Sequence, residues 1–171
     1  MKCNKAVNRA KLVDEPIVEM ILSRKYFNSG LVFMKSDLQS DFDGADLVCY
    51  SDGFRRNINV KRNSSKYYNS KNFTITINKN KLDVFKSTQF VFIDEVGDCL
   101  YVVDGELLCK YILDNSAKLR ETDKENSFYM IIPKKDLVQL VGANGGIIRY
   151  TKAIANLLAA GRDESAYMNL F

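Results

Sequence analysis

The residues with the clearest catalytic potential lie in one short stretch of the chain. Asp43 and Asp46 are followed by Asn59 and Lys61, and the whole chain contains no histidine. The absence of histidine excludes Ser-His-Asp and Cys-His catalysis, and also zinc sites that use imidazole. Hydrolytic chemistry would therefore depend on carboxylates, a lysine and a hard cation such as Mg²⁺, which prefers oxygen ligands.

The pair Asp52-Gly53 predicts a tight β-hairpin that brings these residues together. An Asp-Gly pair favours a two-residue type I′ turn, in which the numbers of paired residues sum to 105. Asp46 would then lie opposite Asn59, with Cβ atoms about 4.5–5.5 Å apart on one face of the sheet. Lys61 follows two residues later on that same face. The turn alone thus predicts a polar cluster of Asp46, Asn59 and Lys61.

Two strings of residues flank this turn, Asp43-Gly44-Ala45-Asp46-Leu47-Val48 and Ile58-Asn59-Val60-Lys61-Arg62. Together they resemble the PD-(D/E)xK nuclease superfamily, and in particular its Holliday-junction-resolvase-like and Mrr-like members. The resemblance implies an α/β fold with a mixed central sheet flanked by helices, a restriction-endonuclease-like core. It also implies a DNA endonuclease that depends on Mg²⁺, for which Mn²⁺ can substitute.

The resemblance also implies a role for each residue. Asp46 is the main metal ligand, Asn59 holds the second ligand position, and Lys61 is the catalytic lysine that orients or activates the attacking water. Glu19, or alternatively Glu15, is the acid from the N-terminal helix that completes the metal site. Asn59 departs from the family pattern, because its amide oxygen is neutral and its side chain is one methylene shorter than glutamine.

A basic segment follows the hairpin and predicts a nucleic-acid-binding surface. Residues 55–86 carry nine lysines and arginines against one acid, whereas residues 13–54 carry eight acids against three bases. Lysine and arginine neutralise phosphates, and tyrosine stacks on unpaired bases. The residues expected to contact nucleic acid are Arg55, Arg56, Arg62, Lys66, Tyr67, Tyr68 and Lys71.

Simpler interpretations of the same residues remain open. Asp46 could be a charge at a strand edge, and the basic segment could be a solvated surface or loop. Two function classes follow: a metal-dependent endonuclease, and a degenerate nuclease fold that binds nucleic acid or a protein partner without cutting. A third and weaker possibility is a small accessory protein of a phage or mobile element that acts on host proteins.

Hydrophobic periodicity and turn residues predict the elements that position these groups. Predicted helices cover residues 14–27, 82–85, 106–113, 136–141 and 147–160. Predicted strands cover residues 31–35, 45–50, 57–62, 73–77, 90–93, 100–103 and 129–132. A second hairpin is expected around Gly97-Asp98.

Composition predicts one domain over residues 1–171, since a chain of this length buries a sizeable core. No apolar run is long enough to cross a membrane and no secretory signal follows the basic N-terminus, so we expect a cytoplasmic protein. Four scattered cysteines without CxxC spacing predict free thiols. The helix predicted over residues 147–160 could form a homodimer interface or, as a simpler alternative, part of the core.

Overall fold

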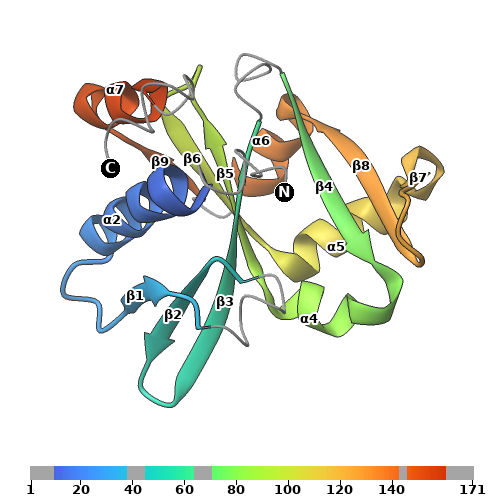
Figure 1. Cartoon of the computed structure of the whole chain (residues 1–171), viewed down its shortest axis with the longest axis horizontal. Coiled ribbons are helices and arrows are strands. Elements are labelled where there is room, and N and C mark those ends of the chain that lie inside the picture. The colour runs from blue at the N-terminus through green and yellow to red at the C-terminus, as the bar shows by residue number, and fades with distance from the viewer. Residues whose placement is uncertain (1–9, 38–44, 64–70, 143–145, 161–171) are drawn as a thin grey trace, which may run out of the picture.

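The protein has an α/β fold built on a six-stranded mixed sheet with helices on both faces, as the sequence predicts (Figure 1). The computed structural model describes residues 10–37, 45–63, 71–142 and 146–160. The strand order of this sheet, sheet A, is β1-β2-β3-β5-β6-β9, and only the β3–β5 pair is parallel. The strands are β1 (Val32–Lys35), β2 (Leu47–Ser51), β3 (Phe54–Arg62), β5 (Gln89–Asp94), β6 (Cys99–Asp104) and β9 (Ile147–Arg149).

A second, three-stranded antiparallel sheet, sheet B, is an addition to the predicted architecture. Its order is β4-β8-β7, formed by β4 (Asn72–Asn78), β8 (Ser127–Pro133) and β7 (Arg120–Glu121). The period-two alternation of β4 and β8 identifies them as strands, but alternation does not say which strand pairs with which. The second sheet therefore had no separate signal in the sequence.

The helices divide between the two faces of sheet A (Figure 1). Helix α2 (Glu15–Lys25), preceded by a π-helical turn η1 (Ala10–Asp14), and helix α7 (Lys152–Ala160) pack on one face. Helices α4 (Leu82–Ser87), α5 (Gly105–Asp114) and α6 (Lys134–Gly142) pack on the other face together with sheet B. Two short 3₁₀ turns complete the fold, η2 (Lys79–Lys81) and η3 (Ser116–Lys118).

Alternation along β3 assigns its residues to these two layers. Ile58 is fully buried in the core that contains α2, together with Leu47 of β2. The neighbouring residues Asn59 and Lys61 point to the other layer, where Phe85 of α4 and Phe90 of β5 lie. The polar residues of β3 that carry the predicted site are therefore on the sheet B side of sheet A.

The predicted hairpin register is confirmed, but its turn type is not. Every β2–β3 pair, from Leu47 with Ile58 to Ser51 with Phe54, sums to 105. In the turn, Gly53 has a φ of 67°, whereas Asp52 is not among the residues with positive φ. A positive φ only at the second loop residue matches a type II turn rather than type I′. This arrangement leaves the left-handed conformation to glycine, which has no Cβ penalty there.

The single helix predicted over residues 147–160 is wrong at its start. Ile147–Arg149 forms β9, which extends sheet A by pairing with β6, and α7 begins only at Lys152. The Thr151 hydroxyl accepts a hydrogen bond from the Ile154 amide at 3.4 Å, as a helix cap does. The β-branched Ile147 and Ile148 suit an edge strand better than a helix.

Two further expectations concern burial and membranes. Cys49, Cys99 and Cys109 are buried free thiols, and Cys3 lies outside the described residues. Ile154 and Leu158 of α7 are buried in the core, so at least this side of the helix serves the core rather than an interface. Among the described helices, none is long and apolar enough to cross a membrane.

Candidate active site

Asp46 is held against β3 at the point where the predicted cluster should form. Its backbone amide donates a hydrogen bond to the Ile58 carbonyl at 2.8 Å, and its carboxylate oxygen Oδ2 accepts one from the Val60 amide at 2.7 Å. The β2–β3 ladder ends at Leu47, which pairs with Ile58, and the Asp46 amide bonds to Ile58 and not to Asn59, so Asp46 departs by one residue from the predicted register. These two hydrogen bonds, one from the Asp46 backbone and one to its carboxylate, join Asp46 to the residues on either side of Asn59 in β3.

Lys61 lies on the same face of β3 as Asn59, and its ammonium interacts electrostatically with the Asp46 carboxylate. Burial lowers the pKa of the Lys61 ammonium from its ordinary value, and the nearby Asp46 carboxylate partly offsets that effect. A lysine whose pKa is lowered by burial and modulated by a specific carboxylate is typical of functional sites, although structural ion pairs also produce such shifts. The predicted proximity of Asp46 and Lys61 is therefore present.

Asn59 and Lys61 open onto a cavity of about 320 Å³ between sheet A, sheet B and α4. Thr76 and Asn78 of β4 contribute polar walls on the far side. Two further lysines line this cavity, which we call the hairpin cavity. Its polar residues are Asn59, Lys61, Thr76, Asn78, Lys81, Thr88, Lys124 and Ser127. Three ammonium groups at one cavity favour an anionic ligand.

Lys81 and Lys124 are functional candidates that sequence reasoning missed. Lys81 belongs to the basic segment of residues 55–86 but carries no motif of its own. Lys124 lies between Asp123 and Glu125 and resembles a solvated loop residue. Only the pairing of β4 with β8 brings these two lysines to the same cavity as Lys61, and nothing in the local sequence indicates that pairing.

The structure does not bring the helix acid to this cavity. Glu19 is half-buried on α2, which packs against the opposite face of sheet A. Glu15, the alternative, is 6% exposed at the start of the same helix. Neither residue lines the hairpin cavity. Asp43 of the predicted motif lies outside the described residues.

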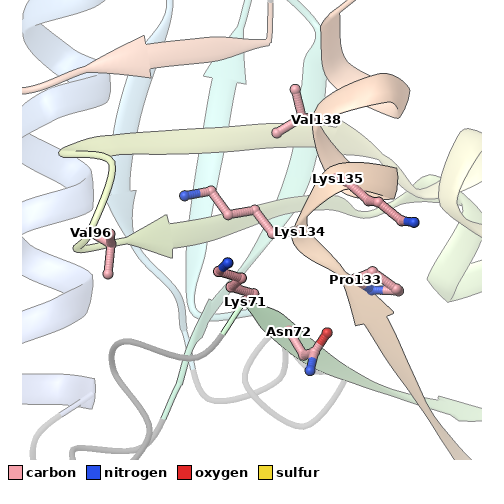
Figure 2. Close-up of a pocket in the computed structure, with 7 residues that line it drawn as sticks. All are labelled: Lys71, Asn72, Val96, Pro133, Lys134, Lys135 and Val138. Atoms are coloured by element: carbon pink, nitrogen blue, oxygen red, sulfur yellow. The ribbon is translucent and has the colours of Figure 1, made fainter.

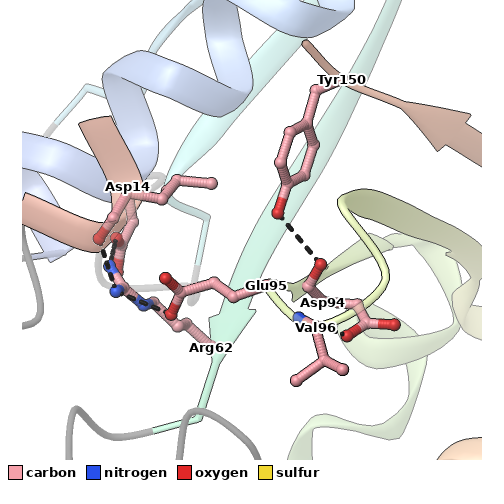
Figure 3. A network of polar contacts seen from close by, with 7 residues as sticks. Asp14, Arg62, Asp94, Glu95, Val96 and Tyr150 are labelled. Carbon is pink, nitrogen blue, oxygen red and sulfur yellow. Dashed lines mark hydrogen bonds and ion pairs between the residues drawn. The ribbon is translucent and has the colours of Figure 1, made fainter. Parts of the chain in front are cut away.

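Arg62 is also placed differently from the expected nucleic-acid surface. Its side chain is only 3% exposed and forms ion pairs with Asp14 and Glu95, which are 3% and 5% exposed. It also donates to the Leu158 carbonyl at 3.0 Å. Figure 3 shows the guanidinium between the two carboxylates. Because strand residues alternate between faces, Arg62 faces the α2 layer and not the hairpin cavity.

The remaining residues of the predicted nucleic-acid surface have mixed positions. Arg55 pairs with Asp37 at 3.5 Å, and Arg56 pairs with Asp104 at 2.8 Å. Lys71 is exposed. The other three residues of that prediction lie outside the described residues, namely Lys66, Tyr67 and Tyr68.

The oxygen donors at the hairpin cavity are few. Asn59 supplies a buried amide oxygen at the cavity, and Asp46, which is not among the lining residues, supplies a carboxylate that acts on Lys61. Within the described part of the chain, no group of three or more Asp, Glu or Cys residues could hold a metal ion. Mg²⁺ usually keeps several water ligands and binds through one or two carboxylates. The donor set therefore fits a Mg²⁺ ion that retains most of its water, and it does not fit a fully protein-coordinated ion.

Comparison with known proteins gives only distant structural likeness. No protein-family model matches the sequence, and no curated protein matches it. A nuclease from a fusellovirus shares 14% identity with a TM-score of 0.44, covering 91% of this chain and 92% of that chain. The Holliday junction resolvase of Archaeoglobus fulgidus shares 10% identity with a TM-score of 0.40, covering 81% of this chain and 99% of that chain. At these scores, the function of this chain has to be argued from its own residues.

Proposed function

We propose that this protein is a divalent-cation-dependent endonuclease that hydrolyses phosphodiester bonds in DNA. The observation that supports the proposal most directly is that the Asp46 carboxylate accepts a hydrogen bond from the Val60 amide, between Asn59 and Lys61 in β3, and acts electrostatically on Lys61. A carboxylate, an amide oxygen and an amine of lowered pKa in one place are the groups that this hydrolysis uses.

Asp46 and Asn59 are the residues that would hold the Mg²⁺ ion. Such an ion, when bound, neutralises charge on the phosphate and lowers the pKa of a coordinated water. The hydrogen bond from Val60 orients the Asp46 carboxylate. Because the Asn59 oxygen is neutral, this site carries one negative charge fewer than a site with two acids, and we expect weaker cation affinity.

Lys61 is the residue that would handle the proton. In the reaction, a water oxygen bonds to phosphorus, one phosphorus–ester oxygen bond breaks, the water loses a proton, and the leaving oxygen takes up a proton from solvent to become a hydroxyl. Burial lowers the pKa of Lys61, so a larger fraction of the amine is neutral near physiological pH and able to accept that proton. Lys81 and Lys124, on the other walls of the cavity, would bind the phosphates on either side.

The test is a cleavage assay on supercoiled, linear, branched and single-stranded DNA, with Mg²⁺, Mn²⁺ or EDTA. We expect cutting only with a divalent cation, and a loss of about 10²–10⁴-fold in Asp46→Ala and in Lys61→Ala, the usual contribution of such groups. Asp83→Ala and Lys118→Ala are matched controls, because both residues are exposed and neither is among the residues that line the hairpin cavity. Equal activity in all four variants would refute the proposal.

A second candidate is a nuclease-like protein that binds nucleic acid or a protein partner without cutting. It is favoured by Asn59 at the position of an acid and by the small donor set. Under this alternative, DNA binding survives in Asp46→Ala and needs no metal.

Asn59→Glu separates the two candidates. If the site is an attenuated nuclease, the added carboxylate should tighten Mg²⁺ binding and raise nicking of supercoiled DNA. The control is Asn57→Glu, two residues earlier on the same face of β3 and outside the hairpin cavity. Unchanged nicking in Asn59→Glu, with metal binding measured to be tighter, would favour the non-cutting alternative.

A further inference from the structure

A second cavity, of about 510 Å³, opens at the opposite end of the β4–β8 ladder from the hairpin cavity. At one end of this ladder, Asn78 pairs with Ser127, and both residues line the hairpin cavity. At the other end, Asn72 pairs with Pro133, and both line the second cavity. Six strand steps of about 3.3 Å separate the two ends, a distance of about 20 Å.

Three lysines line this second cavity, which we call the Lys71 cavity. Lys71 precedes β4, and Lys134 and Lys135 begin α6. In Figure 2, the side chains of Lys71 and Lys134 point toward the β5–β6 turn that carries Val96, and Lys135 lies on the Pro133 side. Its apolar walls are Val96, Pro133 and Val138.

One of the three lysines is neutralised by a buried carboxylate. Lys134 pairs with Asp94 at 2.6 Å, and Asp94 is 4% exposed. Burial would raise the pKa of Asp94, but hydrogen bonds from Lys134, Tyr101 and the Gly97 amide outweigh that effect and lower it. Asp94 therefore stays ionised and holds Lys134 in the cavity wall as a structural group.

The other two lysines keep their positive charge available at the cavity. Among the described residues, no ion pair involves Lys71 or Lys135. The nearest acid in the α6 sequence, Asp136, accepts a hydrogen bond from Tyr111 of α5 at 2.7 Å and is held on that side. The Lys71 cavity thus combines two uncompensated ammonium groups with an apolar wall.

We propose that the Lys71 cavity binds one unpaired nucleotide of the nucleic-acid substrate. Lys71 contacts one of the two phosphates that flank this nucleotide and Lys135 contacts the other, and the base lies against Val96, Pro133 and Val138. The identity of the ligand rests on the proposed nuclease function, but the site is distinct from the hairpin cavity. The volume lies in the range of small-ligand sites, about 300–1,000 Å³, and so accommodates a single nucleotide.

The cavity favours an unpaired nucleotide over one that is paired and stacked in a duplex. A base that is paired and stacked in a duplex cannot enter a cavity, whereas an unpaired base can be splayed out and packed against apolar side chains. Thr74, which is exposed, lies on β4 between the two cavities, and Thr76, on the same face, lines the hairpin cavity; both offer hydroxyl donors for phosphates along this path. The substrate class is therefore DNA with a single-stranded segment close to the scissile bond.

The test measures binding without cleavage, by fluorescence anisotropy in EDTA, on a blunt duplex and on the same duplex with a single-stranded overhang. We expect the wild type to bind the overhang DNA about tenfold more tightly. The double variant Lys71→Ala/Lys135→Ala should lose this preference. The slope of log affinity against log salt should become shallower by about 1.4, since each phosphate contact on a single strand contributes about 0.7.

Two further variants make the result specific. Lys110→Ala/Lys118→Ala removes the same charge from exposed positions that line neither cavity, and it should bind as the wild type does. Val96→Glu places a carboxylate in the apolar wall at a side chain that is 59% exposed, so it should fold normally and lose the overhang preference.

The outcomes separate this inference from the proposed function. Equal binding of blunt and overhang DNA, equal losses in the two double-lysine variants, or equally strong competition by a poly-glutamate peptide would each overturn the nucleotide site. Absence of metal-dependent cutting would instead overturn the nuclease proposal, and the anisotropy result in EDTA would still stand or fall by itself.

Discussion

Lys61 and Arg62 are neighbours in the chain, yet they serve two different regions of the molecule. Arg62 is enclosed by Asp14 and Glu95 in the α2 layer, with its side chain 3% exposed. Lys61 lies on the other face of β3, at the wall of a cavity, and burial lowers its pKa despite the Asp46 charge. The charge of Arg62 is balanced by two ion pairs with carboxylates, whereas at Lys61 the effect of burial exceeds the attraction of Asp46.

The difference indicates what each face of β3 is for. A buried arginine with two carboxylates and a backbone carbonyl is consistent with a fixed junction between η1, β3 and the β5–β6 turn. Burial that exceeds charge compensation, as at Lys61, is destabilising and is common where a side chain serves binding or catalysis. The comparison predicts opposite responses when each charge is removed.

The largest expected effect follows from Arg62→Met. The substitution removes the charge and leaves the carboxylates of Asp14 and Glu95 buried without it, so we expect destabilisation of about 3–5 kcal/mol, measured by urea unfolding. Arg55→Met is the matched control, because its partner Asp37 is 60% exposed and such surface pairs contribute about 0–1 kcal/mol. Equal losses in the two variants would mean that the Arg62 junction is not a stabilising one.

The sequence predicted the position of the site better than the surroundings of the site. A tight turn and the period of two predict that Asp46, Asn59 and Lys61 lie together. The predicted register is confirmed from Leu47 to Ser51, and Asp46 is hydrogen-bonded to Ile58 and Val60, the residues on either side of Asn59. The same period already put Arg62 on the opposite face, but its assignment to a nucleic-acid surface ignored that alternation. Charge composition alone does not distinguish a buried ion pair from a solvated one.

What lay beyond prediction depends on contacts between distant segments. The side chains of α2 pack against β2, β3 and β5. This packing places α2 on the face of sheet A opposite Asn59, and so separates Glu19 from Asn59. That β4 pairs with β8 is equally a long-range choice, and it creates both lysine-bearing cavities. Local propensity carries no information on either choice.

A smaller effect is expected from Gly53→Ala, which tests the turn that sets the register between β2 and β3. Gly53 has a φ of 67°, and an added Cβ would meet open space. The substitution therefore destabilises the fold through the backbone conformation of residue 53 and not through a clash with neighbouring atoms. We expect destabilisation of about 1 kcal/mol, the lower end of the left-handed penalty for an L-residue, measured by urea unfolding. The control is Gly142→Ala, where a Cβ also meets open space but φ is not positive. Equal stabilities of the two variants would contradict the strained turn.

The smallest effect has the opposite sign and concerns Lys61→Met. Because the folded pKa of Lys61 is lowered, the unfolded chain binds more protons between the folded and the unfolded pKa, and wild-type stability rises with pH through that window. Below the folded-state pKa of Lys61, the buried amine is charged and the full destabilisation from burying that charge is present. At pH 7 the methionine variant should therefore melt slightly above the wild type, and the margin should narrow as the pH rises toward the ordinary lysine value.

Asp46 supplies the control for that last prediction. In an Asp46→Asn background the attraction that partly offsets burial is removed, so the gain from Lys61→Met should be larger than in the wild type. A double-mutant cycle of melting temperatures measures this coupling. If Lys61→Met instead lowered stability at neutral pH, Lys61 would be a matched structural cation like Arg62, and the functional contrast between the two faces of β3 would disappear.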